Sequence, residues 1–341
     1  MEPTQRSILT SIGVTLRDFP ESIELAYTAP KLTMTLTQYA AGFSNPINMQ
    51  DTRACFEAWC LIIKAQTKIT KPDLDLEIEL DVKEINNSSY LGGQPSNGHL
   101  GRFLYRILKF SEQYKKWFKL SHDLGEIKEK FKNYLDSNKF VTSAPDKEPK
   151  EDIANYNLES YVEYLFCDSI SAQKDVLGLS SGTTIDRQLP VSLFDATKSN
   201  TTGVFTGGKS AIDFWAVDGD TINVYELKSD NPMVGIITEI FFYSNYVHDV
   251  FISKSLDHGK GGVEIEDGTY RSYNKIIAVK QVKGIMLSNS NRKGWHSSLV
   301  PPIRTAIEKI MNANGMSGAI QYKFLEYQLN PLKIGGYYIS K

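Results

Sequence analysis

The sequence predicts an α/β protein with a central mixed β-sheet flanked by helices, preceded by a mixed, mostly helical N-terminal domain. Three observations support this fold class. The length of 341 residues fits two domains of ordinary size. The second half of the chain alternates between strand and helix periodicity, which is typical of α/β folds. The polar stretch SAPDKEPKED at residues 143–152 contains two prolines and separates the halves as a linker would.

We therefore expect a recognition or regulatory domain over residues 1–145 and a second domain over residues 146–341. Lys and Arg number 38 against 40 Asp and Glu, so the net charge of −2 excludes a globally basic nucleic-acid coat. Three cysteines without regular spacing favour reduced thiols. We find neither a signal peptide nor an apolar run that could span a membrane, so we expect a cytoplasmic protein with no membrane partner.

In the N-terminal half, residues 51–67 have helical spacing, and residues 73–85 alternate between acidic and apolar side chains as a strand does. Residues 101–140 have helical spacing and predict two helices broken near Gly125. Between residues 102 and 139 there are ten Lys or Arg, five Asp or Glu, and interleaved aromatic residues. Such helices suit contact with a nucleic-acid backbone, but a solvated face with the aromatic rings in the core explains them equally well.

In the C-terminal half, helices are expected over residues 156–170, 233–251 and 301–314, and strands over residues 185–194, 211–217, 221–228, 284–287 and 319–327. Pro190 suggests that its strand is an edge strand or contains a bulge. Asp218-Gly219 is a turn dipeptide and predicts a hairpin between two of the strands. The prolines at positions 301 and 302 suit the start of a helix. This order of elements predicts a mixed sheet.

Three charged residues interrupt the predicted hairpin. Asp213 lies inside a strongly apolar strand, and Glu226 and Lys228 end the next strand. Because residues i and i+2 share a strand face, Glu226 and Lys228 point together, and the hairpin places Asp213 within their reach. Two carboxylates and an ammonium are costly to bury without a role. The carboxylates and the Leu227 backbone carbonyl are oxygen ligands suited to Mg²⁺.

This hairpin resembles the PD-(D/E)xK phosphodiesterase superfamily, the restriction-endonuclease-like nucleases. The matching segments are Ile212-Asp213-Phe214 and Glu226-Leu227-Lys228, with Ile212 at the variable proline position. The resemblance extends over roughly residues 153–327 and depends on the surrounding elements for its specificity.

The helices on either side add to the resemblance. The helix before the hairpin is expected to contribute a glutamate, for which Glu159 fits and Glu163 is the alternative one turn later. In the helix after the hairpin, Glu239 and Tyr243 resemble the Gln/Glu-xxx-Tyr pattern of some members. As an ordinary amphipathic pair, these two residues would have no functional role.

The resemblance implies a Mg²⁺-dependent nuclease on a restriction-endonuclease-like core, with Mn²⁺ able to substitute. Asp213, Glu226 and the Leu227 carbonyl would hold the metal, and Glu159 would complete its shell. Lys228 would orient or activate the attacking water and stabilise charge in the transition state. The expected substrate is double-stranded DNA, cut internally to leave a 5′-phosphate and a 3′-hydroxyl. A restriction or antiviral defence role and a homodimer are compatible with this expectation.

Two other functions stay open. The chain could be a non-catalytic nucleic-acid-binding module on a nuclease-like fold. It could also be a nucleotide triphosphatase, because GVFTGGKS at residues 203–210 matches the phosphate-loop pattern. That loop requires a buried strand before it and a helix after it, and the sequence predicts neither. In a nuclease, Lys209 could instead contact backbone phosphates, together with Lys115, Lys116 and Lys119.

Overall fold

The structure is a computed structural model. It describes residues 1–85, 93–142, 157–167, 171–197, 199, 201–205, 210–256, 276, 278–291, 294–316, 318–332 and 337–341, with only the backbone for 171–173. The expected linker and Lys209 lie outside these residues. None of the helices described is long and apolar enough to cross a membrane.

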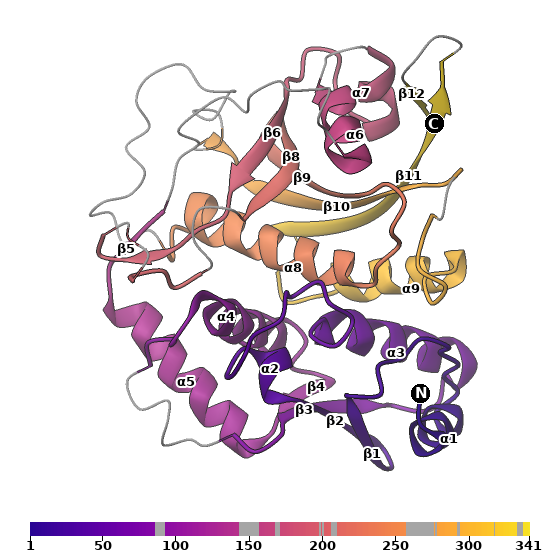
Figure 1. The fold of residues 1–341 in the computed structure, drawn as a ribbon, viewed down its shortest axis with the longest axis vertical. Helices are drawn as coiled ribbons and strands as arrows, with labels where there is room; N and C mark the ends of the chain where they lie inside the picture. Colours follow the sequence, from indigo (N-terminus) through magenta and orange to yellow (C-terminus); the bar gives the residue numbers. More distant parts are fainter. Residues whose placement is uncertain are drawn as a thin grey trace.

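A six-stranded sheet forms the centre of the C-terminal half (Figure 1). Its strands, in spatial order, are β12 (Tyr337–Ser340), β11 (Ile320–Pro331), β10 (Gln281–Asn289), β9 (Thr221–Lys228), β8 (Ala211–Asp218) and β6 (Ile185–Pro190). β10 pairs in parallel with both β9 and β11, whereas the other neighbours are antiparallel. The predicted mixed sheet is therefore confirmed. β6 is an edge strand, as Pro190 suggested.

Helices cover both faces of this sheet. One face carries α8 (Gly235–Val247), which runs on into the π-helix η3 (His248–Ile252), and α9 (Pro301–Asn312). Both helices are crossovers between parallel strands, so they lie on the same side of the sheet. The other face carries α6 (Leu158–Cys167) and α7 (Ser171–Leu177), which pack on a second, smaller hydrophobic cluster.

The N-terminal half contains a second sheet, of which the sequence predicted only the strand within residues 73–85. Its strands, in order, are β1 (Glu24–Thr28), β2 (Lys31–Leu36), β3 (Glu77–Val82) and β4 (Phe118–Leu120). The helices of this half are α1 (Pro3–Ser11), α2 (Gln38–Ala41), α3 (Phe56–Thr70), α4 (Gly98–Gln113) and α5 (His122–Ser137). Figure 1 shows α3 and α4 between this sheet and the helices α8 and α9. Two short strands, β5 (Phe140–Val141) and β7 (Phe194–Asp195), pair with each other.

The two halves pack closely against each other. The larger hydrophobic cluster is continuous across both halves, and all 13 residues of α8 are buried. A Cβ atom on Gly235 would lie 2.2 Å from the carbonyl oxygen of Gln50, and one on Gly101 would lie 1.8 Å from that of Val204. Only glycine allows such close approach of two backbones.

Several predicted boundaries were wrong. The two helices of residues 101–140 do not break at Gly125, which lies inside α5. They break at residues 114–121, because β4 pairs there with β3. The hairpin loop is Gly219-Asp220, one residue later than predicted, because β8 continues through Asp218. Gly219 has the positive φ of 64° that such a loop requires. The single strand predicted over residues 185–194 is split between β6 and β7.

Candidate active site

The β8–β9 hairpin brings Asp213 and Glu226 together. Phe214 pairs with Tyr225, so Asp213 and Glu226 are the next opposed pair and share a face of the sheet. The backbone ladder stops at this point. The Leu227 N–H instead donates to Oδ2 of Asp213 at 2.7 Å. At this end of the hairpin, the Asp213 carboxylate therefore accepts a hydrogen bond that a backbone carbonyl of β8 would accept in a regular ladder.

Aromatic stacking holds α6 over the hairpin. The Phe166 ring of α6 stacks on Phe214 at a centroid distance of 5.1 Å, and Phe214 stacks on Tyr225 at 4.6 Å. Asn157 precedes the helix and accepts the Ser160 N–H at 2.8 Å, as an N-cap does. These contacts place the first turn of α6, which carries Glu159, at the end of the hairpin.

Lys228 lies at the centre of the charged residues. Its Nζ is 2.7 Å from Glu226 Oε1, 3.4 Å from Glu239 Oε2 and 3.7 Å from Glu159 Oε1. The lysine is only 6% exposed. Its three carboxylate neighbours come from β9, α8 and α6. Three separate elements therefore each place one carboxylate beside the same ammonium group.

Negative charge exceeds positive charge in this cluster. Burial raises the pKa of Asp213 well above its usual range, and the nearby Lys228 ammonium opposes the shift only in part. Burial also raises the pKa of Glu226, and the charges of Asp213 and Glu239 add to the effect. Burial disfavours the Lys228 ammonium, but the surrounding carboxylates outweigh it and raise its pKa. A divalent cation would relieve this excess of carboxylates.

The arrangement leaves carboxylate oxygens available to a cation. Oε2 of Glu226 is buried and accepts no N–H or hydroxyl hydrogen bond among the described residues, and the Glu239 carboxyl lies close enough to share a proton with Glu226. Across the same residues, no three Asp, Glu, His or Cys side chains are already grouped as metal ligands. Instead, two carboxylate oxygens of the cluster accept hydrogen bonds: Lys228 Nζ donates to Glu226 Oε1, and the Leu227 N–H donates to Asp213 Oδ2.

A cavity of about 370 Å³ opens over these residues. One wall comes from the hairpin, α6 and α8, and includes Glu159, Glu239 and Tyr243. The N-terminal half also contributes to the lining, with Asn48, Gln50, His99 and Arg102. A neighbouring cavity of about 400 Å³ shares four of the lining residues and extends the opening. The site is thus formed by both halves of the chain.

Arg102 is the charged lining residue that sequence analysis did not place in the site; it also missed Asn48, Gln50 and His99. It lies on α4, is 7% exposed and lines the cavity. Burial lowers its pKa. Its Nη1 donates to Ser210 Oγ over a long distance of 3.5 Å, and Nε has no hydrogen-bond partner in the part of the chain described. A buried guanidinium with an unpartnered donor suits a phosphate oxygen. No local sequence signal distinguishes it from the other basic residues of that segment.

The structure separates the two candidate glutamates of α6. Glu159 lines the cavity, whereas Glu163 lies 3.4 Å from Nη2 of Arg187 and is absent from the lining. Burial raises the pKa of Glu163 to about 7 despite the arginine. Of the two, only Glu159 is placed to contribute to a site at Lys228.

The basic segment of residues 102–139 does not form a single surface. Arg106 is fully buried and forms a bidentate pair with Glu57 at 2.6 Å. Most of the interleaved aromatic residues lie in the core. Lys115 and Lys116 line a different cavity, and the exposed Lys119 Nζ donates to the Lys115 carbonyl.

The residues after the phosphate-loop pattern form a strand. β8 begins at Ala211, directly after Ser210, so the helix that the pattern requires is not there.

No protein-family model, curated protein or solved structure matches the chain. The resemblance to the PD-(D/E)xK nucleases therefore rests on the residues of the hairpin and its flanking helices.

Proposed function

We propose that the protein is a Mg²⁺-dependent nuclease with a restriction-endonuclease-like core. The observation that supports this proposal is the convergence of Asp213, Glu226 and Lys228 at one cavity. Glu159 joins them from the preceding helix and Glu239 from the following helix. We expect internal cleavage of double-stranded DNA and a role in restriction or antiviral defence. Residues 1–145 would supply recognition or regulation, since they contribute to the lining of the cavity.

The available oxygens fit Mg²⁺. Asp213 and Glu226 would hold the ion, and Glu159 would bind it directly or through water. In a strand, the N–H and C=O of one residue face the same neighbour. Because the Leu227 N–H faces Asp213, we expect its carbonyl to face the same side and to serve as a third ligand. Mn²⁺ would substitute because it accepts the same hard oxygen ligands.

The protein's own residues would have the remaining catalytic roles. A bound metal would activate a water and polarise the phosphate. Lys228 is fixed by its carboxylate neighbours and would orient the attacking water and stabilise developing negative charge. Arg102, which lines the same cavity, would contact a non-bridging phosphate oxygen through its guanidinium. The products would be a 5′-phosphate and a 3′-hydroxyl.

A cleavage assay on circular and linear DNA tests the proposal, with Mg²⁺, Mn²⁺ or EDTA. Asp213→Asn and Glu226→Gln should each lower the single-turnover rate by about 10²-fold or more, because each removes a metal ligand. Asp136→Asn is the control, since it removes an exposed carboxylate of α5 that does not line the cavity. Wild-type cleavage by Asp213→Asn would contradict the assignment. DNA binding without cleavage by the wild type would favour a non-catalytic binding module.

A further inference from the structure

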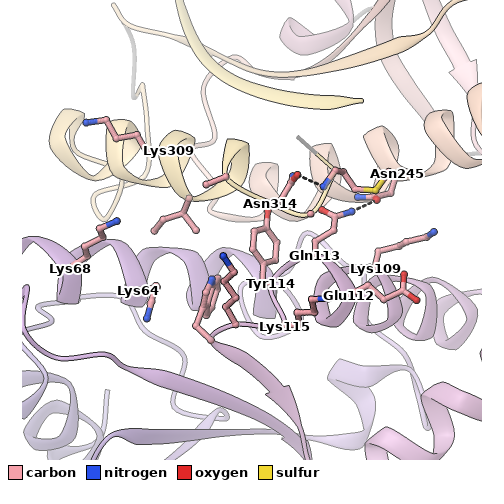
Figure 2. A pocket seen from close by; sticks show the side chains of 16 residues that line it. Lys64, Lys68, Lys109, Glu112, Gln113, Tyr114, Lys115, Asn245, Lys309 and Asn314 are labelled. Atoms are coloured by element: carbon pink, nitrogen blue, oxygen red, sulfur yellow. Dashed lines mark hydrogen bonds between the residues drawn. The ribbon is translucent and has the colours of Figure 1, made fainter. Parts of the chain in front are cut away.

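A third cavity, of about 580 Å³, lies at the C-terminal end of α4, where it is also lined by residues of α3, α8 and α9 (Figure 2). It is formed by α3, the end of α4 with the residues that follow it, and α9. It shares no lining residue with the candidate active site. Its volume lies within the range of small-molecule sites.

The rim of this cavity is strongly basic. It is lined by six lysines, Lys64, Lys68, Lys109, Lys115, Lys116 and Lys309, and by the single acid Glu112. Lys64 pairs with Asp75 at 3.5 Å, and Lys109 pairs with Asp249. No carboxylate of the described residues forms an ion pair with the other four lysines, all of which are exposed. Four ammonium groups from three elements are thus free to meet an anion.

The floor of the cavity contains a buried polar atom without a partner. Gln113 is 8% exposed and its Nε2 donates to Asn245 Oδ1 at 2.5 Å, but its Oε1 has no partner among the described residues. Asn314 is 5% exposed; its Oδ1 accepts the Met316 N–H at 2.7 Å, and its side chain also hydrogen-bonds to Tyr114. Buried polar atoms are rarely left unpaired. The free acceptor of Gln113 therefore points to a polar ligand edge.

Aromatic and aliphatic side chains complete the walls. Tyr114 and Trp117 line the cavity with Ile310 and Met316. Figure 2 shows the Tyr114 ring extending from the end of α4 towards Asn314, with Lys115 beside it. A flat ring could pack between these side chains with its polar edge at the floor.

We infer that this cavity binds a free nucleotide, a phosphorylated nucleoside whose phosphates meet the rim lysines. The base would lie against Tyr114 and Trp117, and its edge would meet Gln113. Neither inorganic phosphate nor a phosphate chain without a nucleoside would contact Gln113 at the floor of the cavity. The volume of about 580 Å³ suits a small ligand, whereas a nucleic-acid backbone is expected along an open groove. This inference does not depend on the nuclease assignment.

Calorimetric titration of the full chain with ATP and with GTP, in EDTA, tests the inference. Lys115→Gln/Lys116→Gln should weaken nucleotide binding by about tenfold or more, because two charge-assisted contacts are lost. Lys119→Gln is the matched control, since it removes a neighbouring charge that does not line the cavity, and it should change affinity less than about twofold.

Four results would overturn the inference. The first is no binding of either nucleotide at millimolar concentration. The second is binding that the double lysine variant leaves unchanged. The third is tripolyphosphate binding as tightly as ATP, which would show a simple anion site. The fourth is tighter binding of a short DNA strand than of ATP with the same dependence on Lys115 and Lys116, which would assign these lysines to nucleic acid.

Discussion

Lys228 Nζ lies 2.7 Å from Oε1 of Glu226, two residues earlier on the same strand. The pair shares one face of β9 because strand side chains alternate. Glu239 and Glu159 approach the same ammonium from two helices on opposite faces of the sheet. The lysine is thus held in one position by charge as well as by packing, as a group that contacts a transition state must be.

Lys228→Met should separate metal binding from chemistry. We expect the single-turnover cleavage rate to fall by about 10²–10³-fold, because transition-state charge loses its cation. Mg²⁺ should bind at least as tightly as to the wild type, since Oε1 of Glu226 is released and a positive charge is removed. Rapid-quench kinetics and calorimetry measure the two effects. Lys280→Met, at an exposed position, is the control. Loss of both cleavage and Mg²⁺ affinity would indicate a structural role instead.

Arg102→Lys should lower activity although it conserves charge. The guanidinium presents donors in a planar fork that a lysine cannot reproduce. We expect kcat to fall by about tenfold or more, with thermal stability within a few degrees of the wild type. Arg6→Lys, far along the chain on α1, serves as the comparison. If Arg102→Lys cleaves at the wild-type rate, Arg102 does not contact the substrate.

The buried Arg106–Glu57 pair should contribute strongly to stability. Its two hydrogen bonds of 2.6 Å and a 3.1 Å bond from Thr238 to Glu57 join α3, α4 and α8. Arg106→Met would leave the Glu57 carboxylate buried without its cation. We expect the free energy of unfolding to fall by about 3–5 kcal/mol, measured by urea denaturation.

The exposed Arg53–Asp51 pair provides the comparison for Arg106→Met. It has similar geometry, with an N···O distance of 2.7 Å. Arg53→Met should cost less than about 1 kcal/mol because water screens the pair. Equal losses for the two variants would show that burial does not govern the energy of the Arg106 pair.

Glu163 should make stability depend on pH. Burial raises its pKa from 4.5 to about 7, so between these values the folded state binds a proton that the unfolded state has released. The free energy of unfolding should therefore fall as pH rises through this range. Glu163→Gln removes the titrating group and should flatten that part of the profile, as measured by thermal unfolding in EDTA from pH 4 upward. Parallel profiles for the two proteins would contradict the shift.

The hairpin could be predicted because its signals are local. β9 has the predicted bounds, and the alternation of side chains fixes which face Glu226 and Lys228 share. The six-stranded mixed sheet followed from the order of periodic segments. Glu159 was preferred over Glu163 by resemblance, and only the structure shows that Glu163 is paired with Arg187.

The remaining features of the fold and of the site depend on contacts between segments that are far apart in the sequence. Arg102 reaches the cavity because α4 packs beside α8, and nothing near residue 102 in the sequence indicates this. The strands β1 and β2 are short, and β4 has three residues that are stabilised by pairing with β3 rather than by periodicity. Tertiary pairing of this kind overrides local propensity.

The complete burial of α8 has a consequence for hydrogen exchange. Every residue of this helix is covered, by the six-stranded sheet on one side and by α3 and α4 on the other. Its amide protons can therefore exchange with deuterium only when the two halves of the chain separate from each other. The backbone that holds Glu239 and Tyr243 should be among the slowest segments to exchange, so the cavity wall that they form persists until global unfolding.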